Sequence, residues 1–298
     1  MAAVWASRPI SKFAMVTIEN LSWSRLTAAD IPGVVALNAE AGWNQNAADW
    51  QFMLDQGEGI GVRGVRDGEL IATAMLLPQD GRFAWIAMIL VTATWQRRGL
   101  ASELMRRCIA RSEDLALIPG LDATEAGRQV YLPLGFRDIY PLTRWQADGL
   151  KIPPESGVRP MLDTDWQAVA AWDSAIHGAP RPALLRHLAL RCPGSAFVAE
   201  QGGQISGFVL ARDGRRATQI GPLSAASAKT AIALLQAALG QETGPVFLDA
   251  ADHHAGLADW LTAAGFSRQR GYMRMLLGRD EPLDDPARVF LIAGPELG

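Results

Sequence analysis

The hexapeptide QRRGLA (residues 96–101) lies between the apolar run FAWIAMILV (residues 83–91) and the segment ASELMRRCIAR. The apolar run is typical of a strand buried on both faces. The segment after it predicts an amphipathic helix, because its apolar residues fall on one face: Leu100, Leu104, Met105, Cys108 and Ile109. Free amides at the start of such a helix, the helix dipole and a glycine together favour a bound anion. With two arginines beside them, these residues predict a phosphate-binding turn.

Composition limits the class of protein. The chain has 298 residues, 49% of them hydrophobic and 20% charged, which is typical of a folded protein long enough for two ordinary domains. A net charge of −3 argues against a nucleic-acid partner. Two cysteines indicate no disulfide framework, and no run of 18 apolar residues predicts a membrane span. We therefore expect a cytoplasmic protein, with residues 1–19 as a flexible tail and no bound metal.

The sequence repeats itself, which predicts two copies of one α/β fold. The segment SRLTAADIPGVVALNAEAG (residues 24–42) is mirrored by RPMLDTDWQAVAAWDSAIHG (residues 159–178). GLDATEAGRQVYLPLGF is likewise mirrored by VFLDAADHHAGLADWLTAAGF, and a hairpin is expected at Asp67-Gly68. A Pro- and Gly-rich linker at residues 148–157 separates a predicted first domain, 20–147, from a second, 158–298.

QRRGLA fits the pattern Gln/Arg-x-x-Gly-x-Gly/Ala, and YLPLGF follows one strand and one helix later. On these motifs the sequence resembles the GCN5-related N-acetyltransferase (GNAT) superfamily, in particular its tandem members. The resemblance implies, for each domain, a mixed and mostly antiparallel sheet flanked by helices. It also implies acetyl-CoA as the acetyl donor. Its pantetheine arm would pair with a splayed strand ending in Ile89, Leu90 and Val91, and its pyrophosphate would lie on Gln96, Arg97, Arg98, Gly99, Leu100, Ala101 and Ser102.

Two further positions take roles from the family. Tyr131 stands where the family places a tyrosine that protonates the departing thiolate, although it could simply be a packed aromatic residue. Thr124 stands where an asparagine often contacts the cofactor. The second copy is predicted to be degenerate, because it has neither arginine nor glycine at the phosphate turn and carries Leu261 in place of the tyrosine.

The resemblance implies acetyl transfer to an amine of a small molecule or protein, by direct attack in a ternary complex. The reaction needs a neutral amine, a proton for the sulfur and a donor to the oxyanion, for which a backbone N–H near Val91 is expected. No acidic residue lies within residues 83–93, so no base is assigned. Trp43, Asn44 and Gln45 are expected at the acceptor pocket; alternatively the tryptophan contacts the other domain. A non-catalytic acyl-CoA sensor is the alternative function, and a monomer or homodimer is expected.

Overall fold

The computed structural model describes residues 21–64, 68–150, 152–153 and 157–298. The predicted tail, 1–19, lies outside this range, as do Asp67 of the expected hairpin turn and part of the expected linker. The first half contains, in chain order, β1 (Ser22–Arg25), α1 (Ile31–Glu40), α2 (Ala47–Gln56), β2 (Glu58–Arg63), β3 (Leu70–Gln79), β4 (Phe83–Val91), α3 (Leu100–Asp114), β5 (Ile118–Ala123), α4 (Glu125–Tyr131) and β6 (Phe136–Ala147).

The second half repeats this order, as the sequence predicts. It contains β7 (Val158–Pro160), α5 (Trp166–His177), α6 (Pro182–Arg191), β8 (Phe197–Gln201), β9 (Gln204–Arg212), β10 (Thr218–Ala225), α7 (Ala228–Leu239), β11 (Val246–Ala251), α8 (Ala255–Ala263), β12 (Ser267–Leu277) and β13 (Val289–Leu291). The α/β class and the duplication are confirmed. No helix in the described part of the chain is long and apolar enough to cross a membrane.

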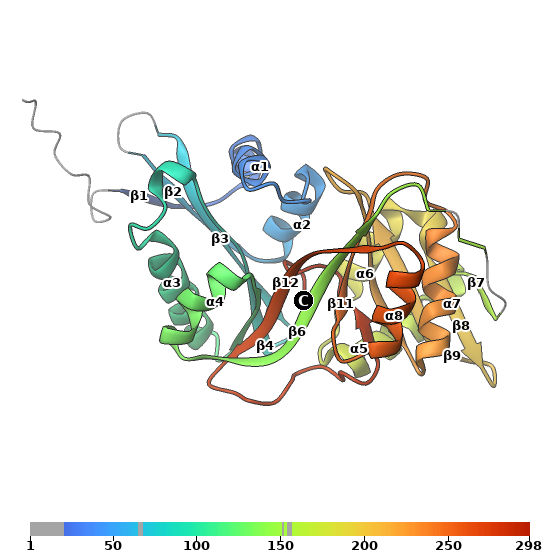
Figure 1. The fold of residues 1–298 in the computed structure, drawn as a ribbon. Coiled ribbons are helices and arrows are strands. Elements are labelled where there is room, and N and C mark those ends of the chain that lie inside the picture. The colour runs from blue at the N-terminus through green and yellow to red at the C-terminus, as the bar shows by residue number, and fades with distance from the viewer. Residues whose placement is uncertain (1–20, 65–67, 151, 154–156) are drawn as a thin grey trace, which may run out of the picture.

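The two halves share one sheet because they exchange their closing strands (Figure 1). The strand order is β1-β2-β3-β4-β5-β12-β6-β11-β13-β10-β9-β8-β7. Strand β12 of the second half pairs antiparallel with β5 of the first, and β6 of the first half pairs antiparallel with β11 of the second. The two exchanged strands also pair with each other at the centre. The repeat predicts two domains but does not predict this exchange.

A buried ion pair secures each exchanged strand. Arg274 of β12 donates two hydrogen bonds to Asp122 of β5, both 2.9 Å long. Arg144 of β6 makes the equivalent contacts to Asp249 of β11, at 2.8 and 2.7 Å. All four side chains are at most 5% exposed. Because removing one partner of a buried pair leaves an uncompensated charge, these pairs oppose separation of the halves.

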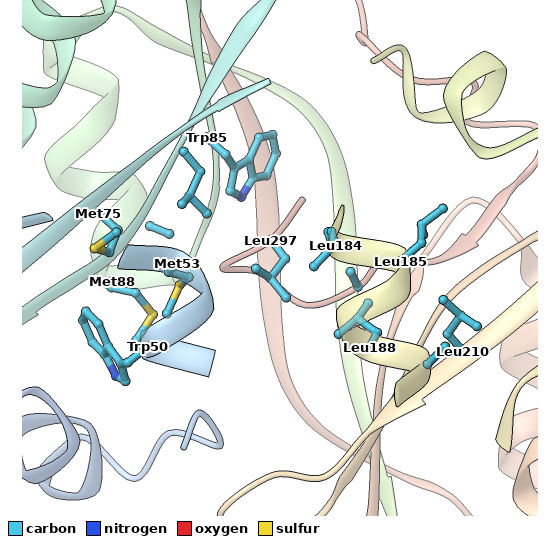
Figure 2. Packing of buried hydrophobic residues seen from close by; sticks show 14 of the residues in the cluster. Trp50, Met53, Met75, Trp85, Met88, Leu184, Leu185, Leu188, Leu210 and Leu297 are labelled. Carbon is cyan, nitrogen blue, oxygen red and sulfur yellow. The ribbon is translucent and has the colours of Figure 1, made fainter. Parts of the chain in front are cut away.

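The helices form two kinds of layer. One face of the first half is covered by α3 and α4, and one face of the second by α7 and α8. The remaining helices, α1, α2, α5 and α6, meet in a core common to both halves, in which Trp50 and Met53 belong to the first half and Leu184 and Leu188 to the second (Figure 2). The halves therefore form one packed body.

Candidate functional site

The candidate site begins where β4 separates from β5. The two strands pair in parallel only from Phe83–Ile118 to Trp85–Gly120. Beyond Trp85, no strand in the described residues pairs with this edge of β4. The unpaired backbone groups of β4 are therefore free to bind an extended ligand.

A bulge re-aims the end of β4. Met75 of β3 pairs with Ala87 and Thr73 pairs with Leu90, so β4 contains one extra residue between these positions. Within the bulge Met88 has a φ of 52°, and the Thr73 hydroxyl donates to its carbonyl at 2.9 Å. Strand β4 therefore changes direction just before the three residues predicted to pair with pantetheine.

Those three residues point to two sides. Leu90 is buried in the core between the halves, whereas Ile89 and Val91 are half-buried against the α3 face. The Val91 carbonyl accepts a hydrogen bond of 3.1 Å from the Gln96 side chain. The side chain of Gln96 thus fixes the predicted phosphate turn to the strand end.

The turn itself is exposed and positively charged. Arg97 (φ 58°) and Gly99 (φ 86°) both have left-handed backbone, and α3 begins directly after them. The Arg98 guanidinium lies 4.8 Å from the centroid of the Trp95 ring. Among the described residues, no group accepts a hydrogen bond from the amides of residues 97–102. The side chain of Leu100 is buried at 1% exposure, whereas Ala101 and Ser102 are half-buried.

These amides can donate hydrogen bonds to a bound anion. The first N–H groups of an α-helix have no intrahelical acceptor, and the residue before α3 is Gly99, which provides no side-chain cap. At the equivalent point in the second half the Ser227 hydroxyl caps α7 and accepts from the Thr230 amide at 3.2 Å. The two halves therefore differ in helix capping as well as in charge.

Glu40 anchors the turn, and sequence reasoning missed it. This residue ends α1, and its carboxylate accepts from the Ala93 amide at 2.7 Å and the Thr92 hydroxyl at 2.9 Å. The contacts fix the segment between β4 and the phosphate turn to the opposite helical layer. Nothing in the sequence around Glu40 indicates this contact, because the two segments are 52 residues or more apart.

Tyr131 ends α4 within the apolar cluster beneath α3. Its ring centroid lies 6.1 Å from that of Phe136. A Cβ at Gly127 would lie 3.0 Å from the tyrosine ring, so the glycine makes room for it. Burial raises the pKa of the phenol above its ordinary value, and its hydroxyl has no hydrogen-bond partner among the described residues. The side chain is therefore a protonated phenol with a free donor at neutral pH.

Thr124 caps α4. Its hydroxyl accepts from the Gly127 amide at 3.2 Å, so the residue in the family's asparagine position holds the helix start. Beside it lies a cavity of about 650 Å³. Its lining comes from the end of β5, from α4 and its cap, and from the exchanged strand: Ala123, Thr124, Glu125, Ala126, Arg128, Arg270, Gly271, Tyr272 and Met273. The second half thus supplies one wall of this cavity.

The segment Trp43–Gln45 lies against the second half. The Asn44 side chain donates to the Ala217 carbonyl at 3.0 Å and accepts from the Arg216 and Ala217 amides at 2.9 and 3.1 Å. The carbonyl of Trp43 accepts from the Arg215 side chain at 3.1 Å. Gln45 is buried, and its carbonyl accepts from Asn38 at 2.8 Å. The contacts of Trp43 and Asn44 join the two halves, whereas Gln45 contacts Asn38 of its own half. An acceptor-binding role for the segment stays a prediction.

In the described residues, no group of three or more His, Cys, Asp or Glu side chains is placed to hold a metal ion. His253 and His254 each direct Nε2 to a backbone carbonyl. Leu261, at the position equivalent to Tyr131, is fully buried.

Comparisons with known proteins agree with this arrangement. Residues 20–136 match the acetyltransferase (GNAT) family, and residues 169–291 match an acetyltransferase (GNAT) domain. The uncharacterized N-acetyltransferase YitH of Bacillus subtilis (strain 168) is 25% identical over 250 residues, which cover 82% of this chain and 87% of that protein. The holothin acyltransferase of Pseudoalteromonas sp. (strain SANK 73390) is 26% identical over 265 residues, which cover 86% and 87%.

A solved structure of a putative acetyltransferase from Pyrococcus horikoshii superimposes with a TM-score of 0.78, covering 96% of this chain and 98% of that one. At 20% identity, this likeness supports the fold alone. Two separate GNAT matches and the duplicated architecture give the same assignment, which confirms the family predicted from the motifs. The chain belongs to the GCN5-related N-acetyltransferase superfamily, and it carries two GNAT domains in tandem.

Proposed function

We propose that the first half is an acetyl-CoA-dependent N-acetyltransferase, which transfers the acetyl group to an amine of a small molecule or protein by direct attack in a ternary complex. The family assignment supports acyl transfer as the reaction class. The observation that carries the proposal is the set of partner-free amides at residues 97–102, placed where β4 leaves β5.

The residues present fit the acetyl donor. The amides of residues 97–102, the left-handed turn at Gly99 and the guanidinium groups of Arg97 and Arg98 would hold the pyrophosphate. The edge of β4 at Ile89, Leu90 and Val91, which no described strand pairs with on this side, would pair with the amides of the pantetheine arm. Thr124 borders the other side of this cleft, at the end of β5. When bound, acetyl-CoA supplies a thioester whose carbonyl carbon is open to attack by a neutral amine.

Tyr131 has the role of proton donor. Its phenol is protonated at neutral pH, as an ordinary tyrosine is, and burial raises its pKa further. When the carbon–sulfur bond breaks, the phenol gives its proton to the sulfur, and a backbone N–H near Val91 donates to the carbonyl oxygen. No base is assigned: the amine attacks in its neutral form, its nitrogen then loses one proton to water, and the Tyr131 phenolate regains one proton from solvent.

The rival function is a non-catalytic acyl-CoA sensor. In a turnover assay the purified chain is mixed with acetyl-CoA and a panel of amines, and released CoA is detected with a thiol reagent. Release that depends on an amine supports the enzyme, and Tyr131→Phe should slow it. Tight acetyl-CoA binding without release for any amine supports the sensor. Cytoplasmic location and a monomeric or homodimeric state stay predictions.

A further inference from the structure

The second half retains a cleft like that of the first. Strands β10 and β11 pair in parallel over three residues and then diverge, as β4 and β5 do. Strand β10 also has a bulge at the equivalent place, since Ile220 pairs with Ala211 and Leu223 pairs with Val209. The geometry that suits an extended ligand is therefore present twice.

Strand β13 fills the second cleft. Leu291 pairs with Leu223 of β10 and also with Ala250 of β11, and Val289 pairs with Ser224. The backbone edges that are left free in the first half are therefore bonded to the chain's own backbone in the second. In the first half, none of the described strands lies between β4 and β5.

The fit of this segment is close. The Ile292 amide donates to the Asp249 carbonyl at 3.1 Å. A Cβ at Gly221 would lie only 2.1 Å from the Ile292 carbonyl oxygen, so the segment needs a residue without a side chain there. The cleft is therefore shaped around residues 289–292.

The residues that follow β13 run into the first half. The Trp85 indole donates to the Pro295 carbonyl at 2.9 Å. A Cβ at Gly298 would lie 3.3 Å from the indole, so this residue lies against the ring. Leu297 is buried in the same cluster as Trp85 and Leu184 (Figure 2). The segment thus joins the filled cleft of the second half to strand β4 of the first.

Trp85 marks the apex of the open cleft. It belongs to the last residue pair that joins β4 to β5, and its partner there is Gly120. A Cβ at Gly120 would lie 2.9 Å from the indole, so the ring covers the strand junction directly. The indole therefore lies at the point from which the two strands diverge.

The segment is itself held firmly. Glu296 is 3% exposed and pairs with Arg212, which is fully buried and also contacts Asp49 of α2. Arg181 donates to the Gly298 carbonyl at 2.8 Å. These contacts connect Glu296 and Gly298 to β9 and to the start of α6, and through Arg212 to α2 of the first half.

We propose that residues 289–298 serve both clefts: β13 occupies the cofactor cleft of the second half, and the residues after it brace Trp85 so that β4 and β5 diverge at the separation that acetyl-CoA requires. Leu297 is then a positioning residue that acts through Trp85. This inference rests on the proposed function for its effect on acetyl-CoA, but the bracing of β4 does not depend on any ligand.

The test compares two identical substitutions in the full chain. Leu297→Ala removes a buried leucine from the cluster that contains Trp85, whereas Leu261→Ala removes a similarly buried leucine from the second half's own core. Trp85→Phe is a further variant, which keeps an aromatic ring but loses the donor to Pro295 and part of the ring surface over Gly120. Each variant is measured by hydrogen exchange of β4 and β5 and by calorimetric titration with acetyl-CoA.

Leu297→Ala and Trp85→Phe should speed hydrogen exchange of the amides in β4 and β5 and weaken acetyl-CoA binding at least fivefold. Leu261→Ala should leave both quantities unchanged. The inference is overturned if β4 and β5 exchange at the wild-type rate in Leu297→Ala, or if Leu261→Ala has the same effect. If Leu297→Ala does not fold, Trp85→Phe decides by the same criteria. If the wild-type chain binds no acetyl-CoA, the proposed function fails. The hydrogen-exchange rates of β4 and β5 still show whether residues 294–298 stabilise these strands through Trp85.

Discussion

Gly99 offers a sharp test of the phosphate turn. It has a φ of 86° and stands directly before the first residue of α3. Replacing it by glutamate adds a side chain to left-handed backbone and places a carboxylate among the amides that we assign to the pyrophosphate. The change therefore acts on backbone strain and on charge at the same site.

The two effects have different magnitudes. A side chain in left-handed backbone costs about 1–2 kcal/mol of folding free energy. A carboxylate about 6 Å from one phosphate charge adds repulsion of about 0.7 kcal/mol in water and about 3 kcal/mol at the effective dielectric of a protein surface. Affinity for acetyl-CoA should therefore fall at least tenfold, which corresponds to about 1.4 kcal/mol.

Gly265 provides the matched control. Its φ is 92°, and a Cβ there would meet only the Leu150 side chain, at 3.6 Å. Gly265→Glu should lose similar stability in thermal unfolding and keep wild-type affinity in calorimetric titration. A folded Gly99→Glu variant that binds acetyl-CoA as tightly as wild type would refute the assignment of this turn.

Four further outcomes are expected. Calorimetry should give one acetyl-CoA per chain, because β13 fills the second cleft; two would contradict its closure. Tyr131→Phe should slow amine acetylation by about 10²–10⁴-fold with acetyl-CoA affinity nearly unchanged, and wild-type turnover would leave Tyr131 a packing residue. Arg274→Met leaves the buried Asp122 without its arginine partner, so it should lower the free energy of unfolding measured in urea by about 3–5 kcal/mol. Arg137→Met, at an exposed pair, should lower it by at most about 1 kcal/mol. Burial and the nearby Arg181 and Arg274 hold the pKa of His177 well below its ordinary value. Only the unfolded chain protonates this residue as the pH falls below about 6.5, so stability should drop by up to about 1.4 kcal/mol per pH unit, and His177→Phe should reduce the slope between pH 6.5 and 5.5.

Local patterns predicted much of the fold and of the candidate site. Helix α3 follows from one-face periodicity, and the family resemblance anticipated that β4 splays from its neighbour. The turn at residues 96–99 follows from two arginines and a glycine between such elements. All of these signals lie within a few residues of one another, where backbone preference and burial pattern decide the outcome.

Contacts between distant segments were not predictable in this way. Glu40 reaches Thr92 and Ala93, and Asn44 reaches Ala217, across separations that no local pattern encodes. A glutamate at a helix end is normally a solvated residue, and an asparagine beside a tryptophan fits a binding loop as readily as a domain contact. Only the packing of the two halves distinguishes these possibilities.

The strand exchange could not be predicted from the sequence for a different reason, which is the symmetry of the repeat. Asp122 and Asp249 stand in matching Leu-Asp-Ala segments, and Arg274 and Arg144 take matching places on the exchanged strands. Because the partners are equivalent, each aspartate could pair with the arginine of its own half or of the other half, and the sequence pattern is the same in both cases. The choice is made by chain connectivity and by the core between α1, α2, α5 and α6.

Once exchanged, each half completes the other's sheet, so the second half can lose its own phosphate turn and still be needed. Strand β12 covers the edge of β5 beside Thr124, and residues 294–298 lie against Trp85 at the base of the open cleft. We expect the second half to act through its contacts with the first half and not through cofactor binding. That is consistent with a buried leucine at position 261, a capped helix at Ser227 and a cleft filled by the chain itself.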